Sequence, residues 1–428
     1  MKLKFLPLFL LVFLLIFNSC NINEVPADED VTEEVTPIET YKVAKIQINT
    51  ENASSITSKD SYIKCSITLE SDKKDWNYSG TGQIKGRGNS SWLWYPKKPF
   101  RLKLDEKDNL LGLKSDRDWV LLADYRDPTH LMNTFAFTVG QGLGIPYPNH
   151  SRYVEVTLNN NYIGMYILTE QVEQGENRVA IDETEGVLIS LDADDGPELS
   201  PGAANNFWSS VYKMPVCVKS PEILYTTQLS GIKSDFAQLE TAIKGADYAA
   251  VAKLFDIPVF IDFLIIQELV YNVEVDAPRS MYLHKNKGGK WTMGPLWDFD
   301  AGFDFDWGTM YTGHNYFKSY KELVLGTSPL NHTGGYNVPS FFTDMFRSKQ
   351  FVAEYKARWL VVKEKLMTEC WDTTQLYADG FADAMQRDAK RWPIDKNNAP
   401  EIQKMKQWLT SRISYLSTVI ENYPAGTK

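Results

Sequence analysis

Several polar side chains in the second half of the chain lie where predicted buried segments end. They are Asn272, Glu274, Asp276, Asp298 and Asp300. The first three follow an apolar run, and the last two follow Pro295-Leu296-Trp297 after a predicted hairpin. Carboxylates in such places can converge on a divalent cation or on a proton to be moved. Asp and Asn often serve only as caps and turn residues. A carboxylate that emerges from an apolar setting, however, needs a metal or a cationic partner, so we expect Asp298 to be functional.

A second candidate for chemistry is a glycine-rich stretch near the start of the chain. Residues 80–89 read Gly-Thr-Gly-Gln-Ile-Lys-Gly-Arg-Gly-Asn, and we expect this segment to need unusual backbone angles. Backbone N–H groups in a glycine loop, with cations on the next strand, suit an anionic phosphate. The cations in question are Lys85, Arg87, Lys97, Lys98 and Lys103. Because glycine-rich hairpins with surface lysines are common, this segment alone is weak evidence for a phosphate site.

The first half of the chain has the sequence pattern of a β-sheet. Apolar and polar residues alternate, or short apolar runs end at turn residues, in segments 43–48, 62–69, 100–104, 119–123, 152–158, 162–170 and 187–191. Asn159-Asn160-Asn161 is a favourable hairpin turn. One helix is predicted over about 128–142, and it should end at Gly142 or Gly144.

The second half is predominantly helical by the same reasoning. Residues 193–225 are rich in Gly, Pro, Asn and Asp and are predicted to form a loop region. Helices are expected from Thr226 onward, with a buried one over 257–271, a hairpin over 280–295 and amphipathic helices over about 339–422. The fold class is therefore α+β, with a sheet-rich lobe over 41–192 and a mostly helical lobe over 226–425.

The amino terminus has the features of an export signal. Lys2 and Lys4 precede an apolar run that ends at Asn18-Ser19-Cys20, so we expect residues 1–19 to be a lipoprotein signal peptide and Cys20 to carry lipid. Residues 20–40 are acidic, contain prolines and should form a flexible tether. Loss of the two lysines would change the formal net charge from −10 to −12, which argues against a nucleic-acid partner. The expected location is the cell envelope, at the outer membrane or the cell surface.

Five motifs together resemble one known family. They are Ile84-Lys85-Gly86-Arg87-Gly88-Asn89-Ser90-Ser91-Trp92, Pro96-Lys97-Lys98-Pro99-Phe100, Tyr166-x-x-x-Glu170, Asn272-Val273-Glu274 and Gly294-Pro295-x-Trp297-Asp298-Phe299-Asp300. The set resembles the CotH kinase family, which is widespread among the lipoproteins of gut Bacteroidetes, and the resemblance covers roughly 41–425. It implies an atypical protein-kinase-like, two-lobed fold. It also implies transfer of phosphate from ATP to protein Ser or Thr with Mg²⁺, or with Mn²⁺ or Ca²⁺.

The resemblance also implies roles for single residues. Asp298 would bind the metal, with Asp300 and Asn272 close by. Lys98 would contact the nucleotide and pair with Glu170, while Arg87 and Lys103 would lie near the phosphates. Many members have Asn-x-Asp where this chain has Asn272-Val273-Glu274, so the catalytic role would fall to Glu274 or to Asp276.

Two other classes of function fit the same residues. A non-catalytic surface protein could bind a glycan or a protein through the same cleft, using the aromatic side chains near the glycine-rich stretch. A glycosidase could use Glu274 and Asp298 as its carboxylate pair. In a glycosidase the lysine and glycine features would have no role.

Overall fold

The structure is a computed structural model that describes residues 34–36, 41–309, 315–331, 333–335, 337–393 and 398–428. The predicted signal peptide, Cys20 and most of the predicted tether lie outside these residues. Within the described part of the chain, no helix combines the length and the apolar character that a membrane crossing needs.

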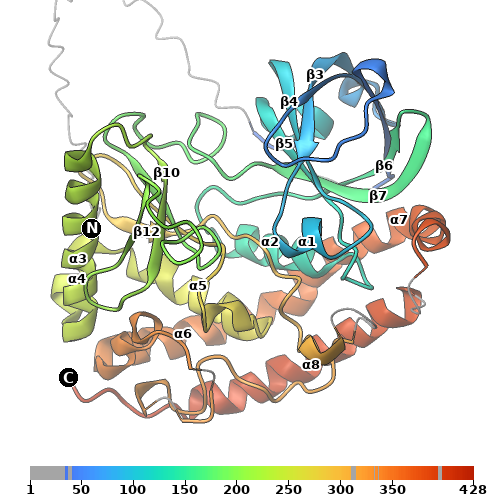
Figure 1. Ribbon diagram of the computed structural model, residues 1–428. Coiled ribbons are helices and arrows are strands. Elements are labelled where there is room, and N and C mark those ends of the chain that lie inside the picture. Colours follow the sequence, from blue (N-terminus) through green and yellow to red (C-terminus); the bar gives the residue numbers. More distant parts are fainter. Residues whose placement is uncertain (1–33, 37–40, 310–314, 332, 336, 394–397) are drawn as a thin grey trace, which may run out of the picture. The chain divides into compact units, whose positions relative to one another are not determined.

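Most strands of the first half close into a seven-stranded barrel (Figure 1). In spatial order they are β1 (Ala44–Thr50), β2 (Ile63–Glu70), β3 (Tyr78–Gly86), β4 (Phe100–Asp108), β5 (Asp116–Leu122), β7 (Asn161–Glu170) and β6 (Arg152–Leu158). Neighbours are antiparallel except β1 and β6, which are parallel and close the barrel. The alternating sequence pattern explains the barrel, because every second side chain of β2 is buried in its interior.

The glycine-rich stretch is a strand rather than a loop. Gly80, Gly82 and Gly86 lie in β3, and within the stretch only Gly88 has a positive φ, of 85°. The expectation of unusual backbone angles was therefore wrong for most of the segment. Close packing explains the glycines instead. A Cβ atom on Gly82 would lie 2.4 Å from the backbone oxygen of Lys103, and one on Gly86 would lie 2.4 Å from the ring of Trp92.

A second sheet of five strands corrects the prediction for 193–225. Its order is β12 (Trp291–Met293), β11 (Met281–Lys285), β8 (Val187–Leu191), β10 (Pro215–Ser220) and β9 (Asn206–Trp208). Both β9 and β10 fall in the segment that was expected to be a loop region. The predicted hairpin is present as β11 and β12, which pair in an antiparallel register.

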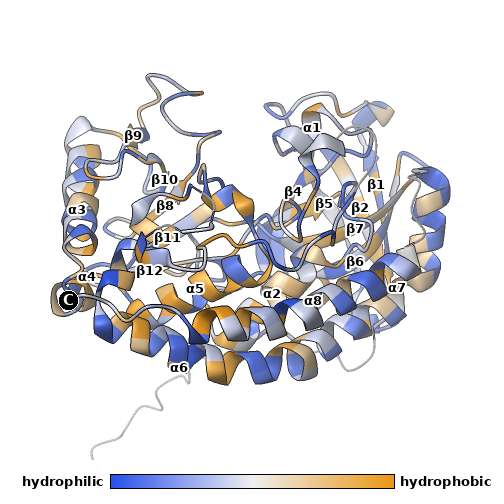
Figure 2. Cartoon of the chain, turned by 90° about the horizontal axis from the view of Figure 1, so that it is seen from below, coloured by the Kyte–Doolittle hydropathy of each residue, from blue (hydrophilic) through white to orange (hydrophobic). Residues whose placement is uncertain are grey.

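The helices are α1 (Ser90–Leu93), α2 (Met132–Leu143), α3 (Thr226–Gly245), α4 (Tyr248–Leu254), α5 (Ile257–Leu269), α6 (Lys349–Lys365), α7 (Trp371–Arg391) and α8 (Asn398–Glu421). Helix α5 is buried and packs on α2, while α7 packs on β7. Figure 2 shows hydrophilic and hydrophobic residues mixed along α7 and α8, as expected of helices with one face toward solvent. The predicted α+β class, with a sheet-rich first half and a helical second half, is confirmed.

Candidate active site

A cavity of about 570 Å³ has a mainly basic wall and a mainly acidic wall. The mainly basic wall is on the barrel side and carries Lys59, Lys85, Arg87, Lys97, Arg101 and Arg126, together with Asp60, Asp124 and Glu173. The mainly acidic wall comes from segments that flank the five-stranded sheet and α5 and carries Asp192, Asp194, Asp195, Glu274, Asp298 and Asp300, together with Lys219 and Arg279. The pairing of β3 with β4 puts Lys85 opposite Arg101 and so concentrates positive charge on one side. Such a cavity can hold an anion and a cation side by side.

The acidic wall holds three carboxylates close enough to perturb one another. Burial, followed by the charge of Asp300, raises the pKa of Asp298 to about 7. Burial, together with Asp298 and Asp300, also raises the pKa of Glu274 well above its ordinary value. The Oε2 atom of Glu274 is buried and has no hydrogen-bond partner. Clustered carboxylates in a buried place require a proton or a cation to neutralise them.

The donor types of this cluster fit a divalent cation, because carboxylate oxygens are the ligands that Mg²⁺ and Ca²⁺ prefer. The orphaned oxygen of Glu274 supports the same interpretation. Across the described ranges, no three Asp, Glu, His or Cys side chains are already arranged as a metal site. The carboxylates therefore suit a cation chemically without forming a finished coordination shell.

Asp298 has an uncommon backbone conformation. Asp298 has φ +66°, in the left-handed region that few residues other than glycine adopt. The next residue, Phe299, is fully buried, and its N–H donates to Oδ1 of Asn133 over 2.9 Å. This hydrogen bond to α2 fixes the segment, so the carboxylate of Asp298 stays directed at the cavity although the backbone is strained. Such strain is typical of functional positions.

Glu274 and Asn272 belong to one short turn but have different roles. Glu274 lies in a 3₁₀ turn, Val273–Val275, and its N–H donates to Oδ1 of Asn272 over 3.2 Å. The amide nitrogen of Asn272 donates to Oε1 of Gln267 over 2.9 Å, and the side chain is fully buried. Both ends of the Asn272 amide are therefore used inside the protein. Asn272 is not among the residues that line the cavity, and it positions Glu274.

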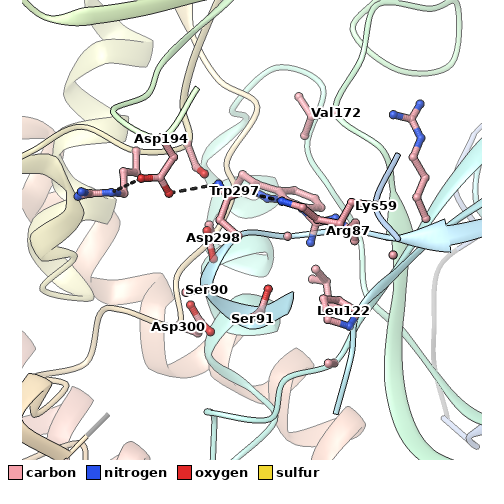
Figure 3. A pocket seen from close by; sticks show the side chains of 18 of the residues that line it. Lys59, Arg87, Ser90, Ser91, Leu122, Val172, Asp194, Trp297, Asp298 and Asp300 are labelled. Carbon is pink, nitrogen blue, oxygen red and sulfur yellow. Dashed lines mark hydrogen bonds and ion pairs between the residues drawn. The ribbon is translucent and has the colours of Figure 1, made fainter. Parts of the chain in front are cut away.

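Arg87 and Asp300 are each held by a partner across the cavity. The guanidinium of Arg87 lies 5.3 Å from the ring centre of Trp297, the residue before Asp298. Figure 3 shows Arg87 beside Trp297, with the side chains of Asp298 and Asp300 both to the left of Arg87. Asp300 accepts a hydrogen bond of 2.6 Å from Arg126. The structure thus brings together Arg87, Asp298 and Asp300 from the set that the sequence singled out.

Other predicted site residues lie elsewhere, and the expected pair of Lys98 with Glu170 is not formed. Lys98 donates to the backbone oxygen of Trp92. Glu170 contacts Nδ1 of His150 at 2.7 Å. Burial would raise the pKa of Glu170, but His150 lowers it to about 2. The side chain of Lys103 is 44% exposed and lies 3.7 Å from Asp118. Neither Lys98, Lys103 nor Glu170 lines the cavity.

The buried lysine is Lys97, the neighbour of the residue that was expected. Its side chain is fully buried, its Nζ lies 2.9 Å from Oδ1 of Asp388 on α7, and it lines the cavity. Lys97 lies in a bend before β4 and Lys98 follows it, and of the two only Lys97 is buried. The sequence shows both lysines, but the choice between them depends on a partner about 290 residues away in the chain.

Asp124 and Arg126 were missed as site residues, although both line the cavity. Asp124 has φ +46°, and its buried Oδ2 has no hydrogen-bond partner. Burial and then the charge of Asp127 raise the pKa of Asp124 well above its ordinary value. Both residues follow β5, and an acid at a strand end was the one available signal. Asp276 was expected as an alternative to Glu274 in the catalytic role, but it lies in an adjoining groove and does not line the cavity.

Comparison with known proteins identifies the family of this chain. The family model described as CotH kinase protein matches residues 84–416. The matched segment begins in β3, ends in α8 and contains Arg87, Glu274, Asp298 and Asp300. A search of curated proteins found no match. Since the family model covers most of the chain, the protein belongs to the CotH kinase family.

Proposed function

We propose that this protein is a phosphotransferase that moves the γ-phosphate of ATP to a Ser or Thr hydroxyl of another protein, with the help of a divalent metal. The observation that carries the proposal is the cavity with a basic wall opposite a cluster of carboxylates. Membership in the CotH kinase family suggests kinase activity and implies the use of ATP. We also infer that the barrel and the helical half act as the two lobes of an atypical kinase-like fold.

The basic wall would bind the phosphates of ATP. Arg87 is the best candidate, because its guanidinium is held on Trp297 and faces the acidic cluster. Lys85 lies in β3, the strand that Arg87 directly follows, and it lines the cavity. Arg101 contributes less net charge, since it already contacts Asp118 at 2.7 Å and Glu173 at 2.8 Å. Charge-assisted hydrogen bonds from these groups would hold the nucleotide in place.

The acidic wall would hold the metal. Asp298 and Asp300 are the side chains that would contact it, with Mg²⁺ as the first choice and Mn²⁺ or Ca²⁺ as alternatives. A bound cation would supply positive charge that neutralises the phosphates and favours the ionised carboxylates. Arg126, which is paired with Asp300, keeps that carboxylate in a fixed position.

Glu274 is the proposed general base, because it lines both the cavity and the groove beside it. An acceptor hydroxyl that enters from the groove would lose its proton to Glu274 as its oxygen bonds to the γ-phosphorus. The bond from the γ-phosphorus to the bridging oxygen would break, and ADP would leave. Asp276 lines only the groove and is better placed to contact the acceptor than to take its proton.

The test is transfer of labelled γ-phosphate from ATP to a mixture of Ser- and Thr-containing proteins. The protein would be used from residue 21 onward, which keeps every described residue. We expect metal-dependent labelling that falls by about 10²–10⁴-fold in Glu274→Gln. Asp276→Asn should remain within about tenfold of wild type. If Glu274→Gln keeps full activity and Asp276→Asn is inactive, the base is Asp276 and the assignment is wrong.

We further propose that the protein acts at the cell envelope, held to the membrane by lipid on Cys20 and spaced from it by the acidic tether of residues 20–40. The lipobox-like end of the apolar amino-terminal run supports this proposal. Metabolic labelling with a palmitate analogue should modify the wild-type protein and not Cys20→Ser. The partner would then be a protein, or a glycan-bearing protein, of the envelope.

A further inference from the structure

A second depression adjoins the cavity, and Glu274 lines both of them. This acceptor groove has a volume of about 600 Å³. It shares with the cavity the residues Asn89, Ser90, Arg126, Asp194, Glu274 and Arg279. A molecule in the acceptor groove would therefore lie beside Glu274, next to whatever the cavity holds. The inference that follows depends on the proposed function, because it concerns the acceptor of the same reaction.

The walls of the acceptor groove carry large apolar side chains that face solvent. Leu93 is 68% exposed, Leu199 is 65% exposed, and Trp94 and Trp307 are 46% and 40% exposed. A single exposed leucine is unremarkable, but several in one depression at the edge of a reaction site indicate a binding surface. Burial of these side chains by a partner would release the water that covers them.

The leucines decide between two classes of acceptor. Sugar rings stack on flat aromatic faces, and Trp94 or Trp307 could supply such a face. Leu93 and Leu199 offer no flat face, and they are more exposed than either tryptophan. Branched aliphatic side chains are suited to the apolar side chains of a polypeptide. The composition of the groove therefore favours a peptide over a glycan.

The two walls are joined, so the groove is held in shape without a partner. Asn89, just before α1, donates to Asp194 over 3.2 Å and so links the barrel side to the loop after β8. Arg279 contacts the other oxygen of Asp194 at 3.1 Å and donates to the backbone oxygen of Ala277. The apolar side chains thus lie on walls that a polar cross-link connects. A preorganised surface costs less entropy on binding.

We propose that the acceptor groove binds an extended segment of the acceptor protein, with a large apolar side chain packed against Leu93 and Leu199 a few positions from the Ser or Thr that is phosphorylated. The hydroxyl then lies at Glu274, where the groove meets the cavity. This enzyme accordingly selects hydroxyl residues that have Leu, Phe or another large apolar residue nearby in the sequence, and it does so in unstructured or extended regions.

The experiment uses an array of Ser-centred peptides, each with one flanking position varied through all residue types, beside an array of glycans. Full-length protein in detergent is scored twice: for retention on the array, which needs no catalysis, and for label transferred from ATP with Mg²⁺. The groove variant is Leu93→Ser with Leu199→Ser. The matched control is Leu360→Ser, a leucine on α6 that is 58% exposed and lies outside the groove.

We expect wild type and Leu360→Ser to favour a large apolar residue at one position by about tenfold or more in both readouts. The groove variant should lose this preference while its thermal shift with ATP and Mg²⁺ stays the same. Retention without apolar preference, preference that persists in the groove variant, or retention only on glycans would each overturn the proposal. If peptides with the apolar residue retain wild type but not the groove variant, and no label is transferred, the groove is confirmed as a peptide-binding site and the proposed kinase activity is refuted.

Discussion

Replacement of Asp298 by asparagine should stabilise the metal-free protein above neutral pH. The carboxylate lies in a buried cluster, and burial together with Asp300 raises its pKa from 3.8 to about 7. Asparagine removes the charge but keeps the size of the side chain. It also tolerates the left-handed backbone that this position requires, with φ +66°. The substitution therefore isolates the electrostatic cost of the cluster.

The magnitude follows from the shift in pKa. One pKa unit corresponds to about 1.36 kcal/mol, so the shift from 3.8 to about 7 means that ionisation of Asp298 in the folded protein costs about 4 kcal/mol above pH 7. In a chain of this size that is a rise in Tm of about 5 °C for Asp298→Asn. The sign depends on pH. Between pH 3.8 and about 7 the folded wild type holds a proton that the unfolded chain releases, so its stability falls as pH rises.

The assay is thermal unfolding of wild type and Asp298→Asn in EDTA from pH 4 to pH 8, followed by tryptophan fluorescence. The gain in Tm should be near zero at pH 4, less than half of its full size at pH 5, and complete by pH 8. Comparison of the two proteins at each pH cancels the titrating groups outside the carboxylate cluster. A variant that is no more stable than wild type at pH 8, or a gain that does not depend on pH, would refute the reasoning.

Three further substitutions test the other buried contacts. Lys97→Met should lower the free energy of unfolding in urea by about 3–5 kcal/mol, because it leaves the Asp388 carboxylate buried without its ion pair, and Asp388→Leu in the same protein should recover part of the loss. Glu170→Gln should cost about 3 kcal/mol at pH 7. That difference should vanish as pH falls from 4.5 toward 2, because the pKa of Glu170 is lowered to about 2 in the folded state. By calorimetric titration, Arg87→Met should weaken ATP binding about tenfold or more, whereas Lys98→Met should leave the affinity unchanged, and equal losses would contradict the assignment.

The fold was predictable where the local pattern and the final environment agree. Strand β2 alternates because one of its faces lines the barrel, and α5 is mostly apolar because nearly all of its residues are buried. Strands β9 and β10 were missed. Strand β9 has only three residues, Asn206–Trp208; it pairs with β10, and β10 pairs with β8. A strand that is stabilised mainly by pairing with other segments need not show a local alternation of apolar and polar residues.

The site was predictable to the extent that chemistry is visible in short segments. Glu274, Asp298 and Asp300 were singled out because they follow predicted buried segments, where a carboxylate needs a metal or a cationic partner. Arg126 was missed, since its partner Asp300 is 174 positions away. The pair Lys97 and Lys98 shows the other limit. Both lysines lie in the irregular segment before β4, and the motif alone does not show which of them meets the buried Asp388.

The most direct test of the nucleotide and metal site is the thermal unfolding of the protein from residue 21 onward with ATP, with Mg²⁺, and with both. We expect a rise in Tm that requires both ligands together, that disappears in Asp298→Ala, and that persists in Lys103→Ala, whose side chain lies outside the cavity. A well-folded wild type that shows no shift with both ligands, or a shift that Asp298→Ala retains, would contradict the assignment of the cavity.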